Sequence, residues 1–165
     1  MNALRIITTG GTIDKVYFDA TSDYQVGTPQ IVQVLTEAQV TLPYVVEQAC
    51  QKDSLDLTDA DRAEIRRRVE AAPERHLLIT HGTDTMTETA RALADIPGKV
   101  IVFTGAMAPA RFRSSDAVFN IGCAVAAAQL APPGVYIVMN GQIFPAAAVR
   151  KNREKKQFEA TGAEV

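Results

Sequence analysis

The chain has 165 residues, 47% of them hydrophobic, which is enough to bury the core of a single domain over residues 1–165. Its 17 basic and 19 acidic residues give a net charge of -2, so no overall field would draw nucleic acid or an anionic membrane to it. The first residues run straight into an apolar strand rather than a basic leader, and no segment approaches membrane-spanning length. We therefore expect a cytoplasmic protein with a small neutral or zwitterionic ligand.

Apolar runs alternate with amphipathic segments along the chain. The apolar runs predict five buried strands at residues 4–8, 45–49, 76–80, 99–104 and 135–139. The amphipathic segments predict four helices at residues 28–38, 59–71, 86–94 and 116–130. Such alternation is typical of an α/β fold, so we expect a mostly parallel sheet flanked by helices.

Three segments have further local signals. Thr58 lies three residues before Asp61, a spacing that predicts a capping box at the start of a helix. Residues 15–27 contain aromatic side chains but no helical period, so we expect a hairpin or flexible flap that covers the site. From residue 150 to 165 the chain becomes polar, and we expect this end to be loosely held.

Two of the predicted strands end in turns rich in glycine and threonine. Thr-Thr-Gly-Gly-Thr-Ile-Asp occupies residues 8–14, and Ile-Thr-His-Gly-Thr-Asp-Thr occupies residues 79–85. Open parallel sheets bind ligands at the carboxyl ends of their strands, so both turns would face one small molecule. A threonine nucleophile between them would make the protein an enzyme.

Each turn by itself also has an ordinary interpretation. The first has neither the Walker nor the dinucleotide-binding spacing, and an ordinary turn fits it as well as a catalytic one. In the second, Asp84 or Thr85 is also a common helix N-cap. A threonine hydroxyl is a weak nucleophile that needs a nearby base, for which Tyr24, Asp84 or a lysine are the candidates.

The cysteines and histidines do not predict a metal site. Cys50 and Cys123 have neither the spacing of a metal ribbon nor a Cys-x-x-Cys motif, so we expect reduced structural thiols. The histidines are His76 and His81, and we expect His81 to orient the second turn.

The two turns, Tyr24 in an Asp-Tyr-Gln-Val-Gly run, Ser54 in Ser-Leu-Asp, and Gly-Ala-Met at residues 105–107 together resemble the bacterial-type L-asparaginase family. The motifs occur in the family's order and extend to Val-Met-Asn at residues 138–140, so the resemblance covers almost the whole chain. It implies the fold of the N-terminal domain of L-asparaginases. It also implies hydrolysis of asparagine, and sometimes glutamine, by a homodimer or homotetramer that needs no metal or organic cofactor.

By this resemblance, Thr12 is the primary nucleophile and Tyr24 its activating residue on the flap. Thr83 matches the family's second threonine, and Lys151 matches the lysine that pairs with it and with the next residue. Several cations lie around Lys151, and a solvated charged face explains them equally well, although the spacing favours Lys151 over Lys155. Thr12 would attack the side-chain amide carbon, ammonia would leave an acyl-enzyme, and water would release aspartate.

The resemblance also implies how the substrate is bound. Asp84 would hold the α-amino group, while Ser54 and the backbone at Gly11 would hold the α-carboxylate. The physical chemistry agrees, because an anion suits an ammonium group and hydroxyl and N–H donors suit a carboxylate.

The sequence departs from the family's pattern in its length. Typical members continue into a second, smaller α/β domain, which lends residues to a neighbouring subunit, including an acidic group near the flap tyrosine. This sequence does not include that domain, which leaves Tyr24 without its partner; a naturally short form and a fragment are both consistent with this. Asp116 and Asn120 match an Asp-x-x-x-Asn of the family, and we expect Asp116 to cap its helix.

Three functional hypotheses follow. The first, which we expect, is an L-asparagine amidohydrolase with no nucleic-acid or membrane partner. The second is a non-catalytic asparagine-binding or regulatory homologue. The third is an amidase on a larger substrate such as an aminoacylated RNA, which the cations at residues 150–156 permit and the near-neutral net charge opposes. The sequence does not predict whether asparagine or glutamine is the preferred substrate, because one methylene changes the binding free energy in a pocket by only about 1–3 kcal/mol.

Overall fold

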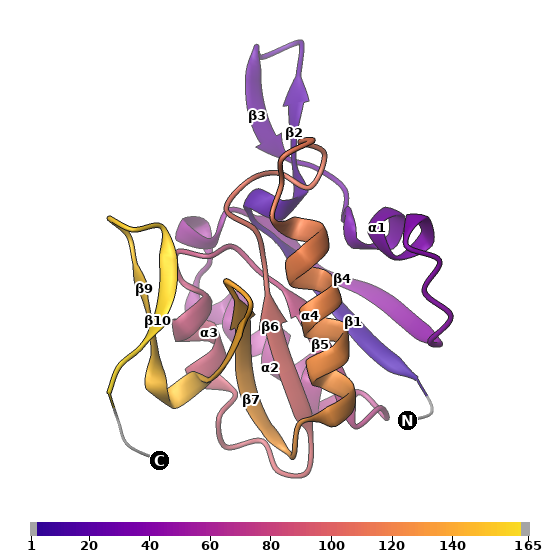
Figure 1. The fold of residues 1–165 in the computed structure, drawn as a ribbon, viewed down its shortest axis with the longest axis vertical. Coiled ribbons are helices and arrows are strands. Elements are labelled where there is room, and N and C mark those ends of the chain that lie inside the picture. Colours follow the sequence, from indigo (N-terminus) through magenta and orange to yellow (C-terminus); the bar gives the residue numbers. More distant parts are fainter. Residues whose placement is uncertain (1–2, 163–165) are drawn as a thin grey trace.

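The structure, a computed structural model, describes residues 3–162. Its centre is a six-stranded sheet in the order β4-β1-β5-β6-β7-β8 (Figure 1). The strands are β1 (Leu4–Gly10), β4 (Tyr44–Lys52), β5 (His76–Thr80), β6 (Val100–Thr104), β7 (Gly134–Met139) and β8 (Gln142–Pro145). The first five are parallel, as predicted, and β8 adds an antiparallel edge that the sequence analysis did not predict.

Helices cover both faces of this sheet, which confirms the predicted architecture. They are α1 (Ile31–Glu37), α2 (Asp59–Ala71), α3 (Met86–Ala92) and α4 (Ala117–Leu130). Successive residues of a strand serve opposite faces: in β6, Val102 packs in the core beneath α1 and α4, and Phe103 packs in the core beneath α2 and α3. The central strands are buried on both sides, which explains why they appear in the sequence as unbroken apolar runs.

The ends of the helices test two local predictions. The capping box is confirmed, because Thr58 and Asp61 exchange hydrogen bonds at the start of α2. The predicted capping role of Asp116 is wrong, because its side chain makes no cap hydrogen bond in α4 and instead accepts from the backbone of the loop before it. In residues 3–162 no helix has the length and apolar character needed to cross a membrane.

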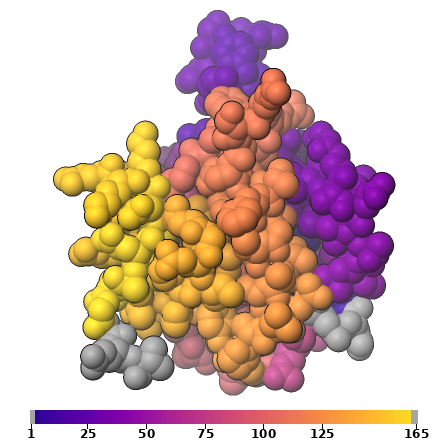
Figure 2. Space-filling model, in the orientation of Figure 1, coloured from indigo at the N-terminus to yellow at the C-terminus, as the bar shows by residue number. Residues whose placement is uncertain are grey.

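Two hairpins lie outside the central sheet. The strands β2 (Lys15–Phe18) and β3 (Asp23–Val26) form the predicted flap, which projects beyond the carboxyl ends of the parallel strands (Figures 1 and 2). The strands β9 (Val149–Asn152) and β10 (Gln157–Ala160) form the second hairpin. Short 3-10 helices are η1 (Thr12–Asp14), η2 (Ser54–Asp56) and η3 (Ala146–Ala148).

The expectation of a loosely held end from residue 150 is wrong for the described part, which reaches residue 162. Phe158 of β10 is only 1% exposed and joins the core beneath α2 and α3. Its backbone N–H also donates to Asn140 Oδ1 at 2.8 Å. The Phe158 ring and its hydrogen bond, together with Val149 of β9, which is buried in the same core, anchor a hairpin whose other residues are largely polar.

Candidate active site

The two glycine and threonine turns meet at the carboxyl edge of the sheet. β1 and β5 are neighbours, and Thr8 lies opposite Thr80 in their register. Beyond this pair, a Cβ atom added at Gly11 would lie only 2.4 Å from the Cα atom of Gly82, so the two backbones are in direct contact. Gly11 also has a φ of 89°, which favours glycine. Thr12 and Thr83 are the residues that directly follow this contact, one on each turn.

Ser54 joins the same centre from the end of β4. A Cβ atom added at Gly82 would lie 2.6 Å from Ser54 Oγ, so Ser54 covers the other side of that glycine. The Thr85 hydroxyl donates to the Ser54 carbonyl at 2.8 Å, which ties η2 to the second turn. Thr85 therefore does not cap α3 with its side chain. Ser54 is 1% exposed and sits at the base of the site.

Lys151 reaches this edge from the β9–β10 hairpin. Its Nζ atom donates to Thr83 Oγ1 and to Asp84 Oδ1, both at 2.8 Å. The Lys151 side chain is 13% exposed and that of Asp84 is 32% exposed, so this ion pair is partly shielded from solvent. Arg153 is a second cation, 3.7 Å from the same Asp84 oxygen. A hydroxyl, an ammonium and a carboxylate thus form one chain of contacts, with Lys151 rather than Lys155 as the predicted lysine.

Thr12 and Tyr24 lie on the flap side of the centre. Thr12 begins η1 and is half-buried. Tyr24 is 45% exposed, and its ring makes edge contacts with Tyr17 and Phe112, whose centroids are 5.4 and 5.6 Å away. Lys15 at the base of the flap pairs with Asp53 at 2.9 Å, so the flap is tied to the turn that carries Ser54.

The backbone of Gly11 is already engaged. Its N–H donates to the Lys52 carbonyl at 2.9 Å, and its carbonyl accepts from the Asp14 N–H at 3.1 Å. The direct contribution of Gly11 to the site is thus close packing between the turns rather than a free N–H donor.

His81 holds the second turn in place, as predicted. The ring is fully buried, and burial lowers its pKa to about 4, so it is neutral near pH 7. In that state Nδ1–H donates to the Gly82 carbonyl at 2.7 Å, and Nε2 accepts from the Thr89 hydroxyl at 2.8 Å. The histidine links the turn to α3 and is positioned as a structural group.

Asp14 is an unusual buried acid at the base of the flap. Its side chain is 2% exposed, Oδ1 accepts from the Gln30 N–H at 2.8 Å, and Oδ2 has no hydrogen-bond partner among residues 3–162. Burial raises its pKa to about 7. Its backbone carbonyl accepts from the Gly27 N–H at 2.8 Å, so Asp14 joins the start of the flap to its end.

Asp116 organises the third turn, at residues 105–107. Its carboxylate accepts from the N–H groups of Met107 and Ala108 at 3.0 to 3.1 Å, and from the Asn120 side chain at 2.9 Å. Asn120 also donates to the Gly105 carbonyl at 2.9 Å. The Asp-x-x-x-Asn pair therefore fixes a loop that lies against the site.

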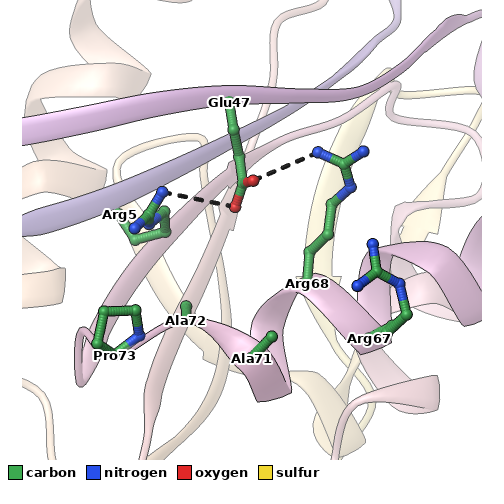
Figure 3. Close-up of a pocket in the computed structure, with 7 residues that line it drawn as sticks. All are labelled: Arg5, Glu47, Arg67, Arg68, Ala71, Ala72 and Pro73. Carbon is green, nitrogen blue, oxygen red and sulfur yellow. Dashed lines mark hydrogen bonds and ion pairs between the residues drawn. The ribbon is translucent and has the colours of Figure 1, made fainter.

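A separate hollow of about 240 Å³ is lined by arginines and other residues of β1, β4 and the end of α2 (Figure 3), and none of its lining residues belongs to the threonine turns. Arg5 forms a bidentate pair with Glu74, and Arg68 contacts both Glu47 and Glu64. Because these cations are already neutralised by carboxylates, this hollow is not a ready anion site. In residues 3–162, no cluster of three or more histidine, cysteine or acidic side chains could hold a metal ion, and both cysteines are free thiols.

The family model of the N-terminal asparaginase domain matches residues 3–162, the same range that the structure describes. The chain belongs to the asparaginase family. It is 32% identical over 164 residues to the glutaminase-asparaginase of Acinetobacter glutaminasificans, covering 91% of this chain and 50% of that protein. It is 31% identical over 159 residues to a glutamyl-tRNA(Gln) amidotransferase subunit from Methanococcus maripaludis, covering 84% of this chain and 35% of that protein.

The fold comparison agrees with the family. The structure superposes on the thermostable L-asparaginase of Thermococcus kodakarensis with a TM-score of 0.83 and 26% identity, over 96% of this chain and 51% of that chain. The resemblance inferred from the sequence motifs is thereby confirmed. The asparaginase-family chain spans about half, or less, of the length of these relatives.

Sequence reasoning missed several residues around the site. Thr85 was considered only as a cap, although it holds Ser54 in place. The buried position of Asp14 was only weakly indicated in the sequence: it ends the first motif and directly follows the apolar Ile13, which is itself buried. No sequence pattern indicated that Phe112 lies near the site, because its contact with Tyr24 joins segments that are distant in the chain.

Proposed function

We propose that this asparaginase-family chain is an L-asparagine amidohydrolase that forms an acyl-enzyme on Thr12. The observation that carries the proposal is the contact of Lys151 with both Thr83 and Asp84, beside a turn that touches the turn bearing Thr12. A lysine held between a hydroxyl and a carboxylate can move a proton at a site where a threonine must be activated. The named asparaginase relatives support the same class of substrate.

In the proposed reaction, the Thr12 hydroxyl attacks the side-chain amide carbon, and the Tyr24 hydroxyl passes the Thr12 proton on to the departing nitrogen. The carbonyl oxygen becomes an oxyanion, the C–N bond breaks, and the nitrogen leaves as ammonia after taking up a proton. Water then attacks the ester, and aspartate is released. The Thr83 hydroxyl and Lys151 relay a proton from that water to the Thr12 oxygen as its bond to the acyl carbon breaks, and Asp84 holds the Lys151 ammonium before and after the relay.

The same residues suit recognition of a zwitterion. Among residues 3–162, Lys151 and Arg153 both contact Asp84 at Oδ1. We assign Oδ2 to the substrate's α-amino group and the Ser54 hydroxyl to its α-carboxylate. Gly11 forms part of the pocket wall through its contact with Gly82. Neither a metal nor an organic cofactor has a role in this scheme.

The test measures ammonia released from L-asparagine and from L-glutamine. Thr12→Ala and Thr83→Ala should each lower kcat by about 100-fold or more, because each removes a group that acts on the reacting atoms. Thr36→Ala is the matched control, because this threonine lies on the exposed face of α1, where its hydroxyl bonds only to the Val32 carbonyl among residues 3–162. Asparagine-dependent thermal stabilisation without ammonia release would favour the binding-protein alternative instead.

A larger amide substrate is the second candidate, favoured by the similarity to the glutamyl-tRNA(Gln) amidotransferase protein. Binding of tRNA that weakens steeply with salt would support it, whereas the net charge of -2 argues against it. A single domain, a location in the cytoplasm and a homodimer or homotetramer remain predictions. Light scattering that shows a monomer at micromolar concentration would remove the last of these.

A further inference from the structure

The central sheet supports the flap only at its base among residues 3–162, where Gln51 of β4 donates to the Val26 carbonyl at 2.8 Å and Lys15 pairs with Asp53 at 2.9 Å. Its strands β2 and β3 form a two-stranded sheet of their own, and the hairpin stands clear of the body of the molecule (Figure 2). The register pairs Tyr17 with Tyr24, so the Tyr17 ring moves with the flap and does not fix Tyr24 relative to the rest of the protein. A contact from another segment is needed to set the place of the Tyr24 hydroxyl.

Phe112 supplies that contact. It lies in the loop between β6 and α4, which rises beside the base of the flap (Figure 1). Its ring centroid is 5.6 Å from that of Tyr24 with an interplanar angle of 72°, an edge-to-face arrangement that aromatic pairs favour. Phe112 is 43% exposed, so packing in the core does not account for its position.

The loop that carries Phe112 is itself firmly held. We call residues 108–115 the clasp. The Ala110 N–H donates to the Ile13 carbonyl at 3.0 Å, one residue after Thr12. At its two ends, the Ala108 N–H donates to the Asp116 carboxylate at 3.1 Å and the Ser115 hydroxyl donates to the Ala108 carbonyl at 2.9 Å. The clasp is therefore a closed loop fixed to α4 and to the first turn.

A second bond joins the clasp to the segment that follows the flap, at the base of the flap. Arg111 Nε donates to Gln30 Oε1 at 3.0 Å, and the Gln30 N–H donates to Asp14 Oδ1 at 2.8 Å. Gln30 is 4% exposed, so the Gln30 end of this link is sheltered from water, whereas Arg111 is exposed. The clasp thus contacts β3 of the flap through Phe112 and is tied to the base of the flap through Arg111.

We propose that the clasp holds the flap over the site and that Phe112 is a positioning residue that sets the place of Tyr24 above Thr12. The part that concerns the reaction rests on the proposed function. Removal of the Phe112 ring leaves the base of the flap tied through Arg111 and frees Tyr24 to move. Because Tyr24 acts on the nucleophile rather than on the bound zwitterion, removal of the Phe112 ring should lower kcat and leave KM nearly unchanged.

The first experiment measures hydrogen exchange of the backbone amides of residues 15–27 in the ligand-free protein. Phe112→Ala should raise exchange across the flap, because the contact holds it closed, while α4 keeps the protection of the unchanged protein. Phe112→Tyr keeps the ring and should restore protection. Phe119→Ala is the matched control, because this ring is 63% exposed on α4 and lies near Gly141. Unchanged hydrogen exchange of the flap amides in Phe112→Ala would overturn the proposal that the clasp holds the flap.

The second experiment measures ammonia release with the same variants. Phe112→Ala should lower kcat about two- to tenfold with KM nearly unchanged, and Phe112→Tyr should recover it. A flap that loosens while kcat stays the same would overturn the positioning role. If the unchanged protein releases no ammonia, the proposed function fails and the positioning role of Phe112 fails with it. The exchange experiment still decides, independently of any activity, whether the clasp holds the flap.

Discussion

Asp14→Asn should change how the stability of the protein depends on pH. Burial raises the pKa of this carboxyl to about 7, against its ordinary value of 3.8. Between these two pH values the folded protein keeps a proton that the unfolded chain has released, so this group stabilises the fold most at low pH and loses that contribution as the pH rises toward 7. Asparagine cannot ionise but still accepts a hydrogen bond from the Gln30 N–H.

The magnitude follows from the two pKa values. One pKa unit corresponds to about 1.4 kcal/mol, so the full effect is bounded at about 4 kcal/mol. Of this, about 2–3 kcal/mol falls between pH 5 and pH 8. His81 works in the opposite direction, because its pKa is lowered to about 4 and its contribution grows as the pH rises from 4 toward 6.5. Both proteins contain His81, so it cancels in their difference.

The assay is urea unfolding at pH 5 and pH 8, followed by circular dichroism because the chain has no tryptophan. The free energy of unfolding of Asp14→Asn minus that of the unchanged protein should be higher at pH 8 than at pH 5 by about 2–3 kcal/mol, so the variant gains relative stability as the pH rises. Asp19→Asn, at the exposed tip of the flap, is the control and should show no such change. An Asp14→Asn difference that is equal at both pH values, or larger at pH 5, would refute the reasoning.

Three further predictions concern the site and its supports. Lys151→Met should lower kcat/KM for asparagine by about 100-fold or more, whereas Lys155→Met on the same hairpin should not; equal losses in the two variants would contradict the assignment. Gly82→Ala should lower the free energy of unfolding by about 1–3 kcal/mol, because its Cβ would lie 2.5 Å from the Ser54 Cβ; unchanged urea unfolding would show that the turns separate without cost. Phe158→Ala should cost about 3–5 kcal/mol in the same assay and also reduce ammonia release, because the hairpin that carries Lys151 loses its buried anchor; a stable variant with full activity would contradict this role.

The sheet could be predicted because its central strands are buried on both faces and leave unbroken apolar runs in the sequence. The meeting of the turns at residues 8–14 and 79–85 followed from the same reasoning, since parallel strands end at one edge. The β9–β10 hairpin could not be found in this way. β10 contains one fully buried ring, Phe158, among partly exposed or exposed residues, so neither a period nor an apolar run marks it.

Contacts between distant segments set the limit of the prediction for the site. Lys151 lies 68 positions from Thr83, and only the family resemblance singled it out among neighbouring cations. Asp14 is an acid in a buried position, which is uncommon for an unpaired aspartate and leaves no pattern in the sequence. The bond of Arg111 to Gln30 spans 81 positions and depends on how two loops fold toward each other.

The central claim is that asparagine is hydrolysed through an ester on Thr12. The most direct measurement mixes the protein with L-asparagine, quenches the reaction in acid within the first turnover, and locates any aspartyl adduct by mass spectrometry of the peptides. We predict an adduct on the peptide that contains Thr12, formed together with ammonia and absent from Thr12→Ala. An adduct on Thr83, or ammonia release that continues unchanged in Thr12→Ala, would contradict the account.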